Sequence, residues 1–116
     1  MKCRDIERAV AFYVGGLGAS VNWGWSGSPD GPNPGYRSVT LLGCELHLSS
    51  FAGDGAFGTA VYLYVDEIDT LAERLRETVP DAIEYGPVDQ EWGQRELYLR
   101  DPDNNALRFG APLAAR

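Results

Sequence analysis

A carboxylate and an imidazole stand two residues apart in the run Cys44–Ser49, as Glu45 and His47. On a β-strand, residues two apart share a face, so the two side chains are expected to meet. Such a pair can provide a general base or two metal ligands, but both roles need further partners. His47 is the only histidine, and the two cysteines lack the spacing of a zinc site. We therefore expect His47 to be a hydrogen-bonded side chain in the wall of a binding site rather than a catalytic residue.

Aromatic side chains alternate with aliphatic ones in the run Ala60–Val65. Val61, Leu63 and Val65 are expected to pack on a helix, which leaves Tyr62 and Tyr64 on the opposite face. Flat aromatic walls suit stacking on heteroaromatic rings. Ordinary packing of a second sheet face is the alternative.

Three further positions are candidates for ligand contact. Trp92 lies in a turn-like Glu91-Trp92-Gly93, where a large apolar ring is commonly a binding feature, or else a lid or interface residue. Trp25, with Trp23 on the same face of its strand, precedes a loop rich in Gly and Pro and would form an opposite wall or a dimer seam. Arg108 could bind a carboxylate or phosphate through two hydrogen bonds. We favour its pairing with Glu45 or Glu96.

The elements that would position these residues occur twice. An amphipathic helix over residues 5–14, capped by Asp5, is followed by strands at 20–25, 36–42 and 44–49. A second helix begins at a capping Asp66 and ends at Pro80. The strand 60–65 precedes it, and the strands 82–85, 94–100 and 105–109 follow it.

The internal repeat predicts an α+β fold of two βαβββ modules, residues 1–52 and 59–116, that together form one domain. The repeat also aligns Arg108 with His47. The opening strand of the first module is mostly missing, reduced to residues 1–4. Its absence exposes a sheet edge, which favours a homodimer.

Charge and composition exclude several classes of partner. Seventeen acidic residues against ten basic ones give a net charge of −7, which disfavours nucleic acid and is compatible with a cationic ligand or with simple solubility. The sequence lacks an apolar run long enough for a membrane span and shows no secretion signal. We expect a cytoplasmic protein with reduced cysteines.

The helix Ile6–Tyr13 and the turn Asp101-Pro102-Asp103-Asn104-Asn105 resemble the glyoxalase/bleomycin-resistance/extradiol-dioxygenase superfamily. The bleomycin-binding resistance proteins are the closer match. Their counterparts in this chain are Gln90-Glu91-Trp92-Gly93, Arg95-Glu96, Arg100-Asp101-Pro102 and Glu45-Leu46-His47-Leu48. The resemblance implies curved mixed sheets around a cleft.

The enzymes of that superfamily hold a divalent metal on four positions, and the resemblance allows each to be checked. The first falls in the missing opening strand, and the second corresponds to His47 or Glu45. The third is Ala60 and the fourth is Arg108, neither of which can donate a lone pair. We expect no metal, no other cofactor and no catalytic residue.

These observations favour non-catalytic binding of a planar, cationic small molecule, with sequestration of the bleomycin-resistance type. The expected ligand-binding residues are Trp25, Glu45, His47, Tyr62, Tyr64, Trp92, Glu96 and Arg108. Two copies would share two clefts across a symmetric dimer. The alternatives are a metal-dependent lyase or isomerase of the glyoxalase or dioxygenase kind, and a dimeric scaffold for an unrelated metabolite.

Overall fold

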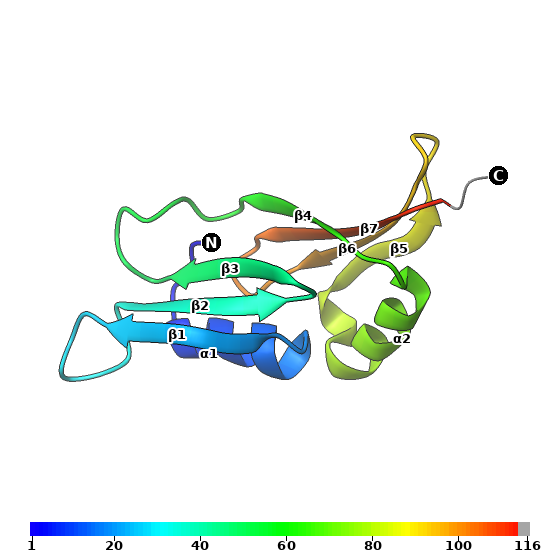
Figure 1. The fold of residues 1–116 in the computed structure, drawn as a ribbon. Coiled ribbons are helices and arrows are strands. Elements are labelled where there is room, and N and C mark those ends of the chain that lie inside the picture. The colour runs from blue at the N-terminus through cyan, green and yellow to red at the C-terminus, as the bar shows by residue number, and fades with distance from the viewer. Residues whose placement is uncertain (114–116) are drawn as a thin grey trace.

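The computed structural model describes residues 1–113 and consists of two β-sheets with one main helix packed against each (Figure 1). In the first sheet, β1 (Ser20–Ser26), β2 (Gly35–Leu41) and β3 (Cys44–Ser49) are antiparallel in the order β1-β2-β3. Lys2 forms a parallel bridge with Ser49 beside β3. Residues 1–3 thus take the place of the opening strand of this module.

The second sheet contains β4 (Ala60–Tyr64), β5 (Ile83–Asp89), β6 (Gln94–Arg100) and β7 (Ala106–Pro112) in the order β4-β7-β6-β5. β4 is parallel to β7, and the other neighbours are antiparallel. This sheet is therefore mixed, and the predicted α+β fold of two βαβββ modules is confirmed. β5 and β7 extend beyond the ranges expected from the sequence.

The first helical segment differs from the predicted single α-helix. α1 covers Ile6–Val10, and a π-helical segment, η1 (Ala11–Gly16), continues it. Asp5 is the N-cap as predicted, because its side chain accepts a hydrogen bond of 3.0 Å from the backbone N–H of Glu7. Ile6 and Tyr13 are completely buried.

The second helix, α2, covers Ile68–Thr78, and a 3₁₀ turn, η2 (Pro80–Ala82), follows it. The prediction that Asp66 caps this helix was wrong. The cap position is Glu67, which makes no side-chain capping bond, because the helix begins later than expected. None of the helices formed by residues 1–113 is long and apolar enough to cross a membrane.

The core lies between each sheet and its helix. In the second module, the buried faces of β4, β6 and β7 pack with the buried face of α2. The residues involved are Leu63, Leu71, Leu75, Leu97, Leu99, Leu107 and Phe109. Because side chains alternate along a strand, this packing directs the intervening residues of β4, β6 and β7 to the opposite face.

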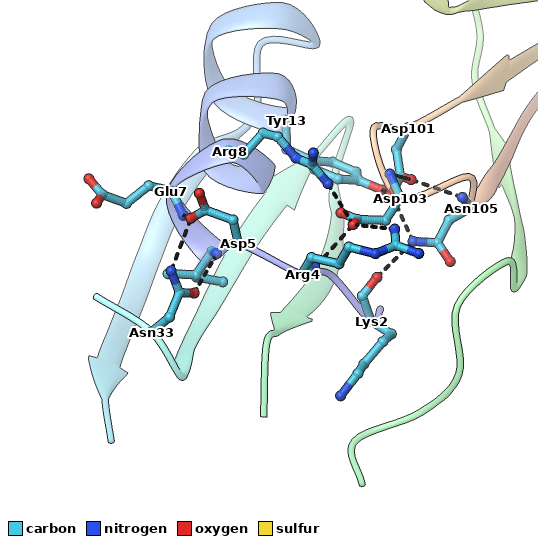
Figure 2. A network of polar contacts seen from close by, with 11 residues as sticks. Lys2, Arg4, Asp5, Glu7, Arg8, Tyr13, Asn33, Asp101, Asp103 and Asn105 are labelled. Atoms are coloured by element: carbon cyan, nitrogen blue, oxygen red, sulfur yellow. Dashed lines mark hydrogen bonds and ion pairs between the residues drawn. The ribbon is translucent and has the colours of Figure 1, made fainter. Parts of the chain in front are cut away.

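A buried polar network joins the N-terminal segment to the β6–β7 turn (Figure 2). The Asp101 carboxylate accepts hydrogen bonds from the Tyr13 hydroxyl at 2.7 Å and from the Asn105 side-chain amide at 2.9 Å. Asp103 accepts from Arg4 and Arg8 at 3.3 and 2.8 Å. Burial and the neighbouring Asp101 carboxylate raise the pKa of Tyr13, so its hydroxyl remains a donor. The turn therefore fixes the relation between the two modules.

Candidate functional site

The face of the second sheet that points away from α2 is lined by tyrosines. Tyr62 on β4, Arg108 on β7, Tyr98 on β6 and Tyr85 on β5 are successive neighbours across the four strands. Tyr64 lies two residues after Tyr62, and the two rings are 5.1 Å apart. We call this surface, formed by Tyr62, Tyr64, Tyr85, Tyr98 and Arg108, the tyrosine face. Tyr62 and Tyr64 are 37% and 69% exposed, as the alternation in their strand predicted.

Glu96 lies on the same side of β6 as Tyr98 and links the rings of this face, because its carboxylate accepts three hydrogen bonds from aromatic side chains. The Tyr62 hydroxyl donates to Oε2 at 2.5 Å, and the Trp92 indole Nε1–H donates to the same oxygen at 3.1 Å. The Tyr98 hydroxyl donates to Oε1 and itself accepts from the Gln90 amide at 3.0 Å. Glu96 is only 3% exposed, so it holds the rings in place and is not a free charge for a ligand.

The hydrogen bonds also determine the charge state of this group. Burial alone would raise the pKa of Glu96, but the bonds from Tyr62, Tyr98 and Trp92 outweigh it and leave the pKa below its ordinary value. Burial and the same bond raise the pKa of Tyr62 above its usual range. The carboxylate is therefore ionised at neutral pH and the phenol is neutral. A negative charge at the hydroxyl end of a ring makes the ring more electron-rich.

Gly110 makes the contact between Tyr62 and Glu96 possible. Gly110 is paired with Tyr64 on one side and with Glu96 on the other. A Cβ atom built on Gly110 would lie 1.9 Å from the Tyr62 hydroxyl oxygen. Without a side chain at this position, the Tyr62 ring crosses the backbone of β7 and reaches the carboxylate.

Trp92 lies in the turn between β5 and β6, as predicted. The turn is closed by a hydrogen bond of 3.1 Å from Gly93 N–H to the Gln90 carbonyl, with Gly93 at a φ of +89°. This backbone conformation favours glycine. The Trp92 ring is 61% exposed, although its N–H is bound to Glu96. One edge of the indole is thus anchored while much of the ring remains open to a ligand.

A second aromatic surface lies on the first sheet, on the face away from α1. The Trp23 and Tyr36 rings stack at 5.7 Å with an interplanar angle of 10°, and the His47 ring packs edge-on against both. Trp25 packs against Phe51 at 4.7 Å. We call the surface formed by Trp23, Trp25, Tyr36, Glu45 and His47 the tryptophan face.

The predicted contact between Glu45 and His47 is present. Oε2 of Glu45 accepts from the Ser38 hydroxyl and contacts His47 Nε2, both at 2.7 Å. The hydrogen bond from His47 lowers the pKa of Glu45 below its usual range. His47 Nδ1 lies 2.6 Å from the Tyr36 hydroxyl. A neutral imidazole would donate from Nε2 to Glu45 and accept from Tyr36 at Nδ1. Both ring nitrogens are therefore occupied.

The structure thus brings the predicted residues together in two groups. Trp25, Glu45 and His47 belong to the tryptophan face, whereas the second sheet carries Tyr62, Tyr64, Trp92, Glu96 and Arg108. Within residues 1–113, no hydrogen bond, ion pair or aromatic contact joins the two groups. One residue of each group borders a cavity: Tyr64 lines a cavity of about 380 Å³ against α2, and His47 lines one of about 260 Å³ beside Tyr36 and Met1.

The family assignment comes from a comparison with models of known families. Residues 1–114 match the model described as glyoxalase superfamily protein. The chain belongs to the glyoxalase superfamily. No protein of curated function matches the chain in sequence.

Several solved structures share the fold of the chain. TnmS3, an antibiotic binding protein from Streptomyces sp. CB03234, is 24% identical, with coverage of 97% of this chain and 92% of that one and a TM-score of 0.71. A glyoxalase/bleomycin resistance protein from the same organism is 25% identical, covers 90% of each chain and has a TM-score of 0.68. A glyoxalase-related enzyme from Clostridium phytofermentans is 23% identical, with coverage of 97% and 90% and a TM-score of 0.77. The neighbours therefore include both a binding protein and an enzyme.

The metal positions of glyoxalase-superfamily enzymes do not fit a metal in this chain. Ala60 opens β4, and the exposed Arg108 stands on β7, where the resemblance places two of the ligands. Glu45 and His47 are engaged with each other. Within residues 1–113, no three His, Cys, Asp or Glu side chains are grouped so that they could hold an ion. A methyl group and a guanidinium offer no lone pair, so we derive no step through a metal.

Sequence reasoning missed several residues of these faces. Tyr98 and Tyr85 belong to the tyrosine face. The alternation of Tyr98 with Leu97 and Leu99 along β6 could have indicated Tyr98. Tyr36 could have been found in the same way from its strand. The role of Gly110 had no local signal, because it depends on a ring from another strand. The favoured pairing of Arg108 with Glu45 or Glu96 was wrong: among the described residues it forms no ion pair, and its guanidinium carbon lies 5.5 Å from the Tyr98 ring centroid.

Proposed function

We propose that this protein binds a planar aromatic small molecule without transforming it, and that the tyrosine face and Trp92 form the binding surface. The observation that carries the proposal is the anchoring of three aromatic residues, Tyr62, Tyr98 and Trp92, to the single buried carboxylate of Glu96. Fixed rings lose little conformational freedom when a ligand stacks on them, which favours binding. The Glu96 carboxylate is buried and already accepts three hydrogen bonds, and the Tyr62 phenol is held neutral, so neither group is free to act as a nucleophile.

The relatives support sequestration as the biological role. TnmS3 is an antibiotic binding protein, and another structural neighbour is a glyoxalase/bleomycin resistance protein. A protein that removes a drug by binding it needs affinity and abundance rather than chemistry. The proposal includes a cytoplasmic location, because sequestration protects the cell only where the drug would act.

Charge and assembly complete the proposal. The chain carries a net charge of −7, and Glu45 keeps more than half of its side chain exposed beside the aromatic rings of the tryptophan face. A positive group of the ligand is therefore expected to lie toward Glu45. We propose a homodimer in which the tryptophan face of one copy stands opposite the tyrosine face of the other. A planar ligand would then be held between Trp25 and His47 on one side and Tyr62 and Tyr64 on the other.

Tryptophan fluorescence tests the proposal at a defined position. Trp23, Trp25 and Trp92 are the three tryptophans, so the double variant W23F/W25F leaves Trp92 as the reporter. Titration of this variant with metal-free bleomycin is expected to change the emission saturably, with the drug recovered intact. Trp92→Phe in the wild-type background keeps an aromatic ring but removes the hydrogen bond to Glu96, and it should weaken binding.

The opposite results are equally definite. An unchanged Trp92 emission with bleomycin and with a panel of planar aromatic antibiotics would contradict binding at this surface. Purification of the protein with one tightly held divalent metal per chain, together with an activity lost in chelator, would support the metal-dependent lyase or isomerase instead.

A further inference from the structure

Arg108 occupies the centre of the tyrosine face. β7 lies between β4 and β6, and the direct neighbours of Arg108 on these strands are Tyr62 and Tyr98. Its side chain is exposed, and its guanidinium lies near the Tyr98 ring. A fixed positive charge is thus placed among the rings on which a ligand is proposed to stack.

The hydrogen-bond donors of Arg108 are unused within residues 1–113, in contrast to those of most other arginines there. Arg4 and Arg8 bind Asp103, Arg95 binds Asp69 and Asp89, and Arg100 binds Glu84. Arg37 and Arg74 donate to backbone carbonyls. Arg76 likewise makes no hydrogen bond in this part of the chain, but it is exposed on α2 and is not part of the tyrosine face.

Glu96 cannot take up the free donors of Arg108. The two charges attract each other, because the positive charge of Arg108 contributes to the lowered pKa of Glu96. However, the carboxylate is buried and already accepts from Tyr62, Trp92 and Tyr98, and it forms no ion pair with Arg108. The Glu96 carboxylate thus balances part of the positive charge of Arg108 without a direct contact, while the Arg108 side chain remains exposed.

We propose that Arg108 binds an acidic group, a carboxylate or a phosphate, carried by the planar ligand that stacks on the tyrosine face. A guanidinium matches two coplanar oxygens through paired hydrogen bonds, which neither a neutral amide nor an ammonium group of the ligand can reproduce. This inference rests on the proposed function and deepens it: the ligand that fits best is amphoteric, with its acidic group at Arg108 and its positive group toward Glu45. Bleomycin carries no carboxylate or phosphate, so it tests stacking on the rings and not the role of Arg108.

Three naphthalene derivatives of similar size test the inference: 2-naphthoate, 2-naphthamide and 2-naphthylmethylammonium. Binding is followed by the NMR signal of the Trp92 indole N–H, assigned by its loss in Trp92→Phe. 2-Naphthoate is expected to bind about tenfold more tightly than 2-naphthamide, a typical gain for one charge-assisted pair. Arg108→Gln should abolish this preference and Arg108→Lys should retain part of it, whereas the matched control Arg76→Gln should behave as the wild type.

The possible failures are distinguishable. Equal binding of 2-naphthoate and 2-naphthamide to the wild type, or a preference for 2-naphthoate that survives in Arg108→Gln, would overturn the role of Arg108 and leave aromatic binding intact. If none of the three compounds shifts the Trp92 signal at millimolar concentration, the proposed function fails and the inference fails with it. Thermal unfolding checks that Arg108→Gln is folded. If it is not, Arg108→Lys, which keeps the positive charge, still tests the role of the guanidinium, because its preference for 2-naphthoate should be reduced.

Discussion

The Tyr62 hydroxyl donates a 2.5 Å hydrogen bond to Oε2 of Glu96 from two strands away, across the bare backbone of Gly110. This diagonal contact gives the tyrosine face its geometry. The ring lies down over β7 instead of standing away from the sheet, and its hydroxyl stays neutral next to an ionised carboxylate. A flat and electron-rich surface results.

The Gly110→Ala substitution should disrupt this contact. The new methyl group would lie 1.9 Å from the Tyr62 hydroxyl oxygen, so the ring must move and its bond to Glu96 is lost. We expect the free energy of unfolding to fall by about 1–3 kcal/mol, as for overpacking of a well-filled site. Urea unfolding measures the change, and Gly15→Ala is the control, because a Cβ added there would meet no side chain and no other element within 4 Å. Equal stability of the two variants would argue against the close approach of Tyr62 to Gly110.

The pH dependence of stability should report the ionised state of Glu96. Its pKa is lowered in the folded protein, so the stabilisation is complete above the ordinary value of 4.5 and is lost as the pH falls below it. The stability difference between wild type and Glu96→Gln should therefore shrink from pH 6 toward pH 3 in urea titrations. Glu73→Gln, an exposed site on α2, serves as the control. A difference that stays constant over this range would be incompatible with a buried, ionised Glu96.

The buried bond between Tyr13 and Asp101 should contribute strongly to stability. Tyr13→Phe removes the 2.7 Å donor and leaves a buried carboxylate oxygen with one partner fewer. We expect a loss of about 1–3 kcal/mol in the free energy of unfolding. Tyr85→Phe removes a hydroxyl from a half-exposed ring and should change stability by less than about 0.5 kcal/mol. Similar losses in the two variants would show that the Asp101 network does not hold the modules together.

The two cysteines should differ in reactivity. Burial raises the pKa of Cys3 to about 11, and the side chain is almost inaccessible, whereas Cys44 is partly exposed. Only a thiolate reacts with iodoacetamide. At pH 8 the native protein should therefore be alkylated at Cys44 and spared at Cys3, with both labelled after denaturation, as measured by peptide mass spectrometry. Rapid labelling of native Cys3 would show that the N-terminal segment is not packed as described.

Sequence reasoning succeeded where a feature depends on one strand alone, and failed where it depends on contacts between distant segments. Alternation along one strand correctly placed Tyr62 and Tyr64 opposite Leu63, because a single packed face decides the orientation of every second residue. The prediction that Asp66 caps the second helix was wrong, because the residue at which a helix begins depends on how the preceding strand ends. The role of Glu96 as the acceptor for three rings was out of reach, since it requires Tyr62, Gly110 and Trp92 to converge from three segments. Arg108 was expected to be paired, but its neighbours across the sheet are tyrosines rather than acids.

The central claim is that a planar ligand binds to the rings of Tyr62, Tyr98 and Trp92, which are hydrogen-bonded to Glu96, and is released without chemical change. The most direct measurement is a two-dimensional ¹H–¹⁵N NMR titration of the labelled protein with metal-free bleomycin and with 2-naphthoate, following the three indole N–H signals and the integrity of the ligand. The account predicts a saturable shift of the Trp92 signal, attenuated in Gly110→Ala, with the ligand recovered intact. An unmoved Trp92 signal, combined with changes at Glu45 and His47 that require an added divalent metal, would contradict it.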